Sequence, residues 1–210
     1  MATVTGSAGE RGPLGGSMAD PIGLGMRLHS WSAVVVAVSG TVGSPVVIHR
    51  DHVTLLEDPV LREPYHAAVG RPLDEAQALI ESVAETAASA AAMTLTELAS
   101  SLGSVATVGL VGGDRRVQTD LPKILASHAR LHAAERNLYE QAIIEGASRA
   151  GLPVTAVPAT GKLFDHASQA LGVPLEPSLA ALGKALGPPW QKDHKEATAV
   201  ALVALGRISV

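Results

Sequence analysis

Three short apolar runs early in the chain constrain its fold most, because they follow one another so closely. They span 33–38, 46–49 and 52–56, and turn-forming residues at 39–40 and 43–45 separate the first two. A parallel connection needs a crossover of a dozen or more residues, so strands this close pair as antiparallel hairpins. The sequence therefore predicts an antiparallel meander of three strands.

Helices and strands alternate along the rest of the chain. Helical periodicity and breaker residues predict helices at 73–102, 122–150, 161–171, 177–186 and 193–205, with strands at 106–111 and 152–157. Pro153 and Pro158 flank the last strand, and because proline cannot donate to a sheet ladder we expect this strand at a sheet edge. The predicted order is β-β-β-α-β-α-β-α.

The N-terminal segment is predicted to lie outside the fold. Seven glycines and two prolines fall in residues 1–25, so we assign 1–30 to a disordered tail and 31–210 to a single domain, with Met18 and Met26 as alternative starts. The segment lacks the plan of a signal peptide, and no apolar run is long enough to span a membrane. A chain without cysteine forms no disulfide, and we expect a cytoplasmic protein.

The second long helix carries an unusual stripe of ionisable residues. At 100° per residue, the side chains of His128, His132, Glu135 and Tyr139 fall at the centre of the apolar arc, whereas Glu140 falls on the opposite, polar face. A carboxylate buried there without a partner would cost several kcal/mol. The stripe therefore needs a partner, which is either another side chain or a metal ion.

Two interpretations of the stripe stay open. Two histidines four residues apart on one helical face can share a divalent ion, with Glu135 one turn further on as a third ligand. Alternatively, Glu135 accepts hydrogen bonds in a buried network that only fixes packing. His66, in the connector before the first long helix, and Asp114, after two glycines, are further polar candidates.

Two acids open the last helix. Asp193 and Glu196 have the spacing of a capping box, in which the first residue is the N-cap and the second returns the hydrogen bond. Both acids also lie on the face that packs inward. Carboxylates at positions i and i+3 aimed at a sheet can hold a magnesium ion, so the sequence supports a structural and a metal-binding interpretation.

The element order, together with Asp193-x-x-Glu196 at the head of an Ala-rich final helix, resembles the Holliday-junction resolvase branch of the ribonuclease H-like superfamily. The topology covers 33–205, and the motif covers the two acids. The resemblance implies a ribonuclease H-like α/β fold, with a five-stranded mixed sheet and helices on both faces. It also implies Mg²⁺ or Mn²⁺ at an acidic site. The segments 127–135 and 188–197 further resemble uncharacterised bacterial proteins, which implies no activity.

The sequence departs from the resolvase pattern at two strands. Nucleases of the superfamily place an aspartate in the first strand, where residues 37–39 offer only the hydroxyl of Ser39, and the strand at 106–111 carries no carboxylate. Asp114 lies just beyond that strand and is the nearest substitute, although an acid after two glycines is also typical of a turn. Without the first-strand aspartate, a two-metal mechanism lacks its bridging ligand.

Three functions remain as hypotheses, and an actin-like nucleotide-binding relic, suggested by the hairpin at 39–44, ranks below the other two. The first is a divalent-metal-dependent nucleic-acid phosphodiesterase with a degenerate site, in which Glu135, Asp193 and Glu196 are catalytic and metal-binding, His128 is a further ligand and His132 handles protons. The second is a non-catalytic ribonuclease H-like module that binds a partner protein or itself as a homodimer. A net charge of −4 disfavours a nucleic-acid partner. We expect no nucleotide or organic cofactor and no membrane partner.

Overall fold

A five-stranded mixed sheet forms the centre of the computed structural model, which describes residues 20–113 and 119–208. The sheet order is β3-β2-β1-β4-β5, with β1 (Ile22–His29), β2 (Ser32–Thr41), β3 (Ser44–Thr54), β4 (Val105–Val111) and β5 (Val154–Val157). The first three strands form an antiparallel meander, whereas β4 and β5 run parallel to β1. The expected edge position of the strand between prolines is confirmed.

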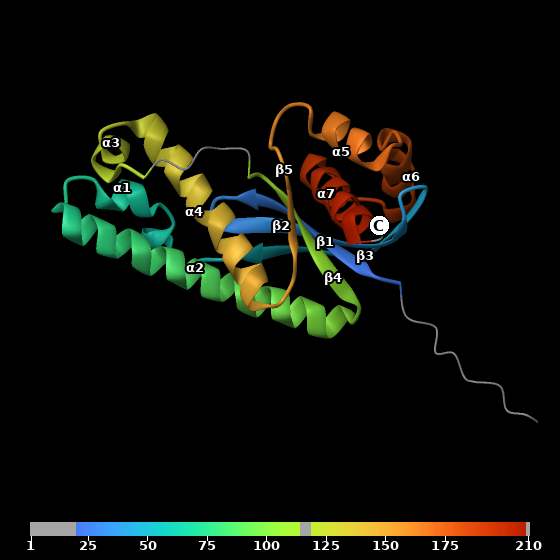
Figure 1. The fold of residues 1–210 in the computed structure, drawn as a ribbon, viewed down its shortest axis with the longest axis horizontal. Helices are drawn as coiled ribbons and strands as arrows, with labels where there is room; N and C mark the ends of the chain where they lie inside the picture. The colour runs from blue at the N-terminus through green and yellow to red at the C-terminus, as the bar shows by residue number, and fades with distance from the viewer. Residues whose placement is uncertain (1–19, 114–118, 209–210) are drawn as a thin grey trace, which may run out of the picture.

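Helices cover both faces of this sheet (Figure 1). One layer holds the long helices α2 (Leu73–Leu102) and α4 (His128–Arg149), and the other holds α5 (Leu163–Leu171), α6 (Glu176–Leu186) and α7 (Lys192–Ile208). The short segments η1 (Pro59–Leu61), α1 (Pro64–Ala68) and α3 (Leu121–Leu125) complete the helices of the described residues. In Figure 1, α1 and α3 lie at one end of the α2–α4 pair, beyond the sheet.

Alternation along β2 explains how the two layers form. Ala33, Val35 and Ala37 face the α2–α4 layer, and Val34, Val36 and Val38 face the α7 layer. Successive side chains of a strand point to opposite faces, so an unbroken apolar run buries both. The same alternation on β1 sends Leu24, Met26 and Leu28 toward α2 and α4.

Glycines let α7 approach the sheet closely. A Cβ atom placed on Gly25 of β1 would overlap the carbonyl of Ala197, and one placed on Gly109 of β4 would overlap that of Val200. The backbone of α7 therefore packs directly on β1 and β4, which the Ala-rich sequence of this helix permits. This contact fixes the first turn of α7 beside the end of β1.

Three expectations about the elements are wrong. Residues 22–29, which the sequence analysis assigned to the tail, form the central strand β1, and the runs predicted as two strands at 46–49 and 52–56 form the single strand β3. The predicted helix at 122–150 is interrupted at 126–127 and forms α3 and α4. The expectation for residues 1–19 falls outside the described residues.

The element order and fold class are confirmed despite these shifts. The strand order 3-2-1-4-5, with an antiparallel meander followed by two parallel strands and helices on both faces, is the ribonuclease H-like arrangement. Among the described helices, none combines the length and the apolar character needed to cross a membrane.

Candidate functional site

The predicted site residues of the described chain fall into two separate clusters, one in each helical layer. We call Arg27, His29, Asp193 and Glu196 the acidic cluster, and His66, His128, His132 and Glu135 the histidine cluster. The acidic cluster lies between β1 and α7, whereas the histidine cluster lies between α1 and α4. The structure therefore does not bring Glu135 together with Asp193 and Glu196, and one ion shared by these three acids is not supported.

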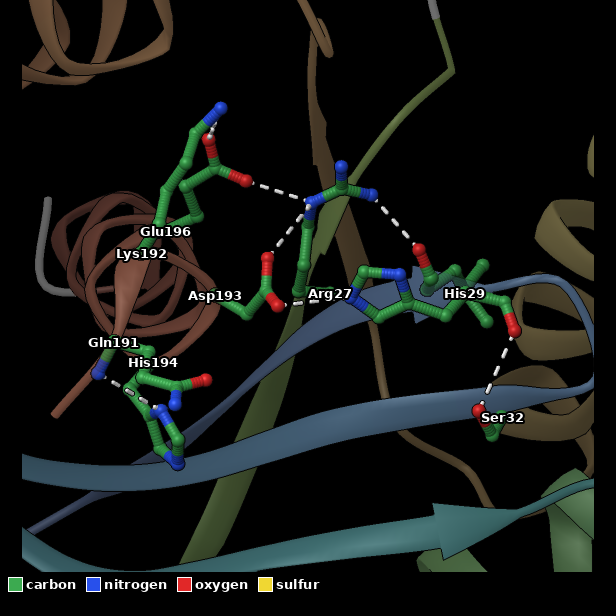
Figure 2. Close-up of polar contacts among 9 residues, drawn as sticks. Arg27, His29, Ser32, Gln191, Lys192, Asp193, His194 and Glu196 are labelled. Carbon is green, nitrogen blue, oxygen red and sulfur yellow. Dashed lines mark hydrogen bonds and ion pairs between the residues drawn. The ribbon is translucent and has the colours of Figure 1, made fainter. Parts of the chain in front are cut away.

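In the acidic cluster, a guanidinium lies between the two carboxylates (Figure 2). The Nε–H of Arg27 donates to Oε2 of Glu196 at 2.6 Å, and the same Nε lies 3.9 Å from Oδ1 of Asp193. Nε2 of His29 lies 3.0 Å from the other Asp193 oxygen, and Nζ of Lys192 lies 3.5 Å from Oε1 of Glu196. Each carboxylate is thus matched by a basic group of the chain itself.

Burial makes the Arg27–Glu196 pair the strongest of these contacts. Glu196 is 6% exposed, so its carboxylate needs a charge partner, and Arg27 reaches it from the neighbouring strand. Arg27 also donates from Nη1 to the carbonyl of Leu28, which fixes the guanidinium in place. A divalent ion at these acids would have to displace a positive charge that belongs to the fold.

The first strand carries an arginine, and not an aspartate, beside the two acids of α7. The acid was expected at 37–39, but the first strand is β1, whose Arg27 contacts both Asp193 and Glu196 and whose His29 contacts Asp193. The expected capping box is also replaced, since α7 starts at Lys192 and the Asp193 carboxylate contacts Arg27 and His29 instead.

The histidine cluster joins one histidine of α1 to two of α4. Nε2 of His66 lies 3.4 Å from Nδ1 of His128, and Nε2 of His132 lies 3.1 Å from Nε2 of His128. One ring nitrogen of each histidine lies within 4.8 Å of the other two. The His128 and His132 spacing was visible in the sequence, whereas His66 was only a polar candidate in a connector.

Glu135 lies beneath the three rings and orients His66. Oε1 of Glu135 lies 2.8 Å from Nδ1 of His66 and accepts the backbone N–H of His66 at 3.2 Å, while Oε2 lies 3.7 Å from Nδ1 of His132. An ionised carboxylate only accepts hydrogen bonds, so this contact assigns the proton of His66 to Nδ1. Nε2 is the ring nitrogen that faces His128.

Two tyrosines border Glu135 without taking part in the cluster. The hydroxyl of Tyr139 donates to the carbonyl of Arg62 at 2.9 Å. Burial, followed by the charge of Glu135, raises the pKa of Tyr139 above its ordinary value, and the same two causes raise the pKa of Tyr65. Both phenols are therefore neutral at physiological pH.

Glu140 of α4 is buried, although the sequence predicted it on the polar face of the helix. Glu140 is 3% exposed, and its Oε2 accepts the backbone N–H of Gly113 at 3.0 Å. Gly112, just beyond the end of β4, leaves room for this carboxyl group, and the glycine pair at 112–113 is the sequence signal that could have indicated it. Asp114, the predicted substitute for a strand acid, falls outside the described residues.

The comparisons with known proteins concern the fold. No family model and no curated protein matches the sequence. Among solved structures, the chain is similar to one titled "T. thermophilus RuvC in complex with Holliday junction substrate", at 14% identity and a TM-score of 0.46, over 87% of this chain and 91% of that chain. A likeness of this size assigns no role to any residue. The chain has a ribonuclease H-like fold, as its own element order and strand order establish.

Proposed function

We propose that the protein binds one divalent transition-metal ion of the zinc type, with His66, His128 and His132 as ligands and Glu135 as their outer partner. The observation that carries this proposal is the convergence of three imidazoles from two helices above one buried carboxylate. Such an ion would give the chain a Lewis-acid centre, which is the chemical basis of metal-dependent hydrolysis.

The cluster offers the nitrogen donors that such an ion requires. Zinc binds imidazole nitrogen at about 2.0–2.1 Å, so two nitrogens on a tetrahedral ion lie about 3.3–3.4 Å apart. One nitrogen of each histidine lies within 4.8 Å of the other two. The close contacts of His128 use different ring atoms, Nδ1 toward His66 at 3.4 Å and Nε2 toward His132 at 3.1 Å, so the rings would reorient to bring three nitrogens to one ion. Imidazole ligands favour Zn²⁺, Ni²⁺ and Cu²⁺, whereas Mg²⁺ and Mn²⁺ prefer carboxylate and water oxygen.

The contact of Glu135 with His66 supports the proposal independently. Metal-binding histidines almost always donate their second ring N–H to a carboxylate or a carbonyl, which fixes the ligand nitrogen toward the metal. Nδ1 of His66 makes this contact with Glu135, and Nε2 is thereby directed at His128. The arrangement explains why the helix buries a carboxylate at the centre of its apolar face.

A magnesium- or manganese-dependent nuclease at the acidic cluster is the second candidate. The spacing of Asp193 and Glu196 beside the end of β1 favours it, and nucleic acid would be its partner. Arg27 counts against it, because a guanidinium stays protonated in proteins and occupies the space between the two acids. We therefore place the second candidate below the first.

Calorimetric titration of metal-free protein tests the first candidate. We expect one Zn²⁺ per chain, a rise in the melting temperature with Zn²⁺ or Ni²⁺, and no comparable rise with Mg²⁺. His132→Ala is expected to lower the affinity for Zn²⁺ by at least about 100-fold, more than the loss usual for an outer partner. The matched control is His52→Ala, an exposed histidine of β3, which should bind as the wild type does. Equal affinities of the two variants would refute the histidine site.

A cleavage assay tests the second candidate. Branched, hybrid and single-stranded nucleic acids are incubated with the protein in Mg²⁺ or Mn²⁺, alongside the Asp193→Asn variant. We expect no cleavage by either protein. Cleavage that the wild type performs and Asp193→Asn does not would reverse the ranking of the two candidates.

A further inference from the structure

We infer that the metal ion at the histidine cluster keeps one coordination position open to solvent and takes a small anionic nitrogen or oxygen donor there. This inference rests on the proposed function and goes one step beyond it. A closed site would hold the ion only for stability, whereas an open site can bind and polarise a second molecule.

The number of protein ligands is the first support. Structural zinc sites are almost always closed by four protein ligands, while sites that act on a ligand use three and leave the fourth position to water or substrate. In the described part of the chain, the residues that converge on one point are His66, His128 and His132. Cysteine, the usual fourth ligand of closed sites, is absent from the sequence.

The hydrogen bonds of the neighbouring oxygen atoms are the second support. Oε1 of Glu135 accepts two hydrogen bonds from His66, and Oε2 lies 3.7 Å from Nδ1 of His132 on a side chain that is 4% exposed. Tyr139 donates to a backbone carbonyl, and burial keeps its phenol neutral. Among the described groups around the cluster, these residues fix the ligands in place but do not fill the fourth position.

The exposure of the rings supplies the third support and shows where the open position lies. The side chain of Glu135 is 4% exposed and forms the floor of the cluster, whereas that of His132 is 53% exposed, and His128 is also exposed. An ion held between these rings has protein on the side of Glu135 and solvent on the side of the two α4 histidines. A ligand would enter from that solvent side.

The charge of the ion decides the chemical class of the ligand. The three histidines are neutral when they bind metal, so the ion keeps its full double positive charge at the ligands, and Glu135 offsets one unit from below. A small anion with a nitrogen or oxygen donor is attracted to such a centre. Inorganic azide is a suitable probe, since it is small and coordinates metals through nitrogen.

Visible absorption of the cobalt-loaded protein tests the open position. Co²⁺ replaces Zn²⁺ in histidine sites, and its absorption bands respond to the number and type of ligands. We expect azide to change the spectrum saturably, with one azide per cobalt. The His52→Ala control should give the same change, and His132→Ala should show neither cobalt binding nor an azide response.

The outcomes separate this inference from the proposal on which it rests. Cobalt that binds in the wild type but not in His132→Ala, with a spectrum that azide leaves unchanged, would overturn the open position and leave the metal site standing. Cobalt binding that His132→Ala does not weaken would overturn both. A saturable azide response in the wild type, absent from His132→Ala, supports both.

Discussion

The acidic cluster and the histidine cluster meet the same physical problem in different ways. Each surrounds a glutamate that a helix directs into the fold, Glu196 on α7 and Glu135 on α4, and each glutamate needs a compensating group. Glu196 receives the guanidinium of Arg27, while Glu135 receives the ring of His66. A guanidinium carries a permanent charge, whereas an imidazole can bind a proton or a metal ion.

This difference is why we treat the acidic cluster as structural and propose the histidine cluster as the site that binds a ligand. The acidic cluster is neutralised within the chain, and α7 packs on the sheet with backbone contacts that leave little freedom. The histidine cluster directs nitrogen atoms at one another and lies partly in solvent. The spacing of Asp193 and Glu196 suggested a metal ion at α7. The groups that face a carboxylate therefore indicate a metal site better than the carboxylates alone do.

The largest effect is expected from the packing that holds the acidic cluster. Gly25→Ala would drive a methyl group into the carbonyl of Ala197, and we expect the free energy of unfolding to fall by about 3 kcal/mol, the upper end for overpacking. Urea denaturation measures it. Gly43→Ala is the control, because a Cβ there meets no atom within 4 Å. A Gly25→Ala variant as stable as this control would contradict the close approach of α7.

Removing the guanidinium should break the acidic cluster itself. Arg27→Met keeps the apolar stem and leaves the buried Glu196 with only the longer contact to Lys192, so we expect a loss of about 1–3 kcal/mol in the free energy of unfolding. The double variant Arg27→Met with Glu196→Gln should recover part of this loss.

The effect of Mg²⁺ on the melting temperature of Arg27→Met tests whether the guanidinium occupies an ion site. If the guanidinium occupies the place of an ion, Mg²⁺ should raise the melting temperature of Arg27→Met and not that of the wild type. If Mg²⁺ raised the melting temperature of the wild type as much as that of Arg27→Met, the acidic cluster would bind an ion in spite of Arg27. Both clusters would then be metal sites.

The two glutamates should differ in their effect on Zn²⁺. Glu135→Gln removes the acceptor that orients His66, and loss of an outer partner typically lowers metal affinity about 10–100-fold. Glu196→Gln, at the other cluster, should leave the affinity within about threefold of the wild type, a change worth less than 1.4 kcal/mol. Competition with a chromophoric chelator measures both. Equal losses in the two variants would remove the distinction between the clusters.

The smallest effect concerns an exposed ion pair on the α2–α4 layer. Hydrogen bonds from Arg149 and Ser89 lower the pKa of Glu85 from 4.5 to about 2. Because the folded pKa is depressed, the pair stabilises the fold above pH 4.5, and this contribution is lost as the pH falls toward 2. NMR titration of the carboxyl carbon should show the low pKa, and Arg149→Gln should return it toward 4.5. Zn²⁺ affinity should not change, since this pair lies outside both clusters.

Local patterns in the sequence predicted much of the fold. The closeness of the early strands required antiparallel pairing, helical periodicity located the long helices, and the stripe on α4 correctly indicated that Glu135 is buried. These predictions succeed because each depends on residues a few positions apart. The prediction failed for β1, whose alternating glycines resemble a loop in composition, and for Glu140, which fills the space left by Gly112 just beyond β4. It was also wrong for His128 and His132, which the stripe placed in the apolar arc and which are exposed.

The partners of the two glutamates were decided by tertiary structure alone. Arg27 and Glu196 are separated by 169 positions, and His66 and Glu135 by 69. Helical periodicity predicts that a side chain points inward. The residue that this side chain contacts depends on strand register and on how closely the layers pack. The sequence by itself determined that this chain buries carboxylates on two helices. Only the folded layers determined that one of them faces a guanidinium and the other a histidine whose second ring nitrogen faces a further histidine.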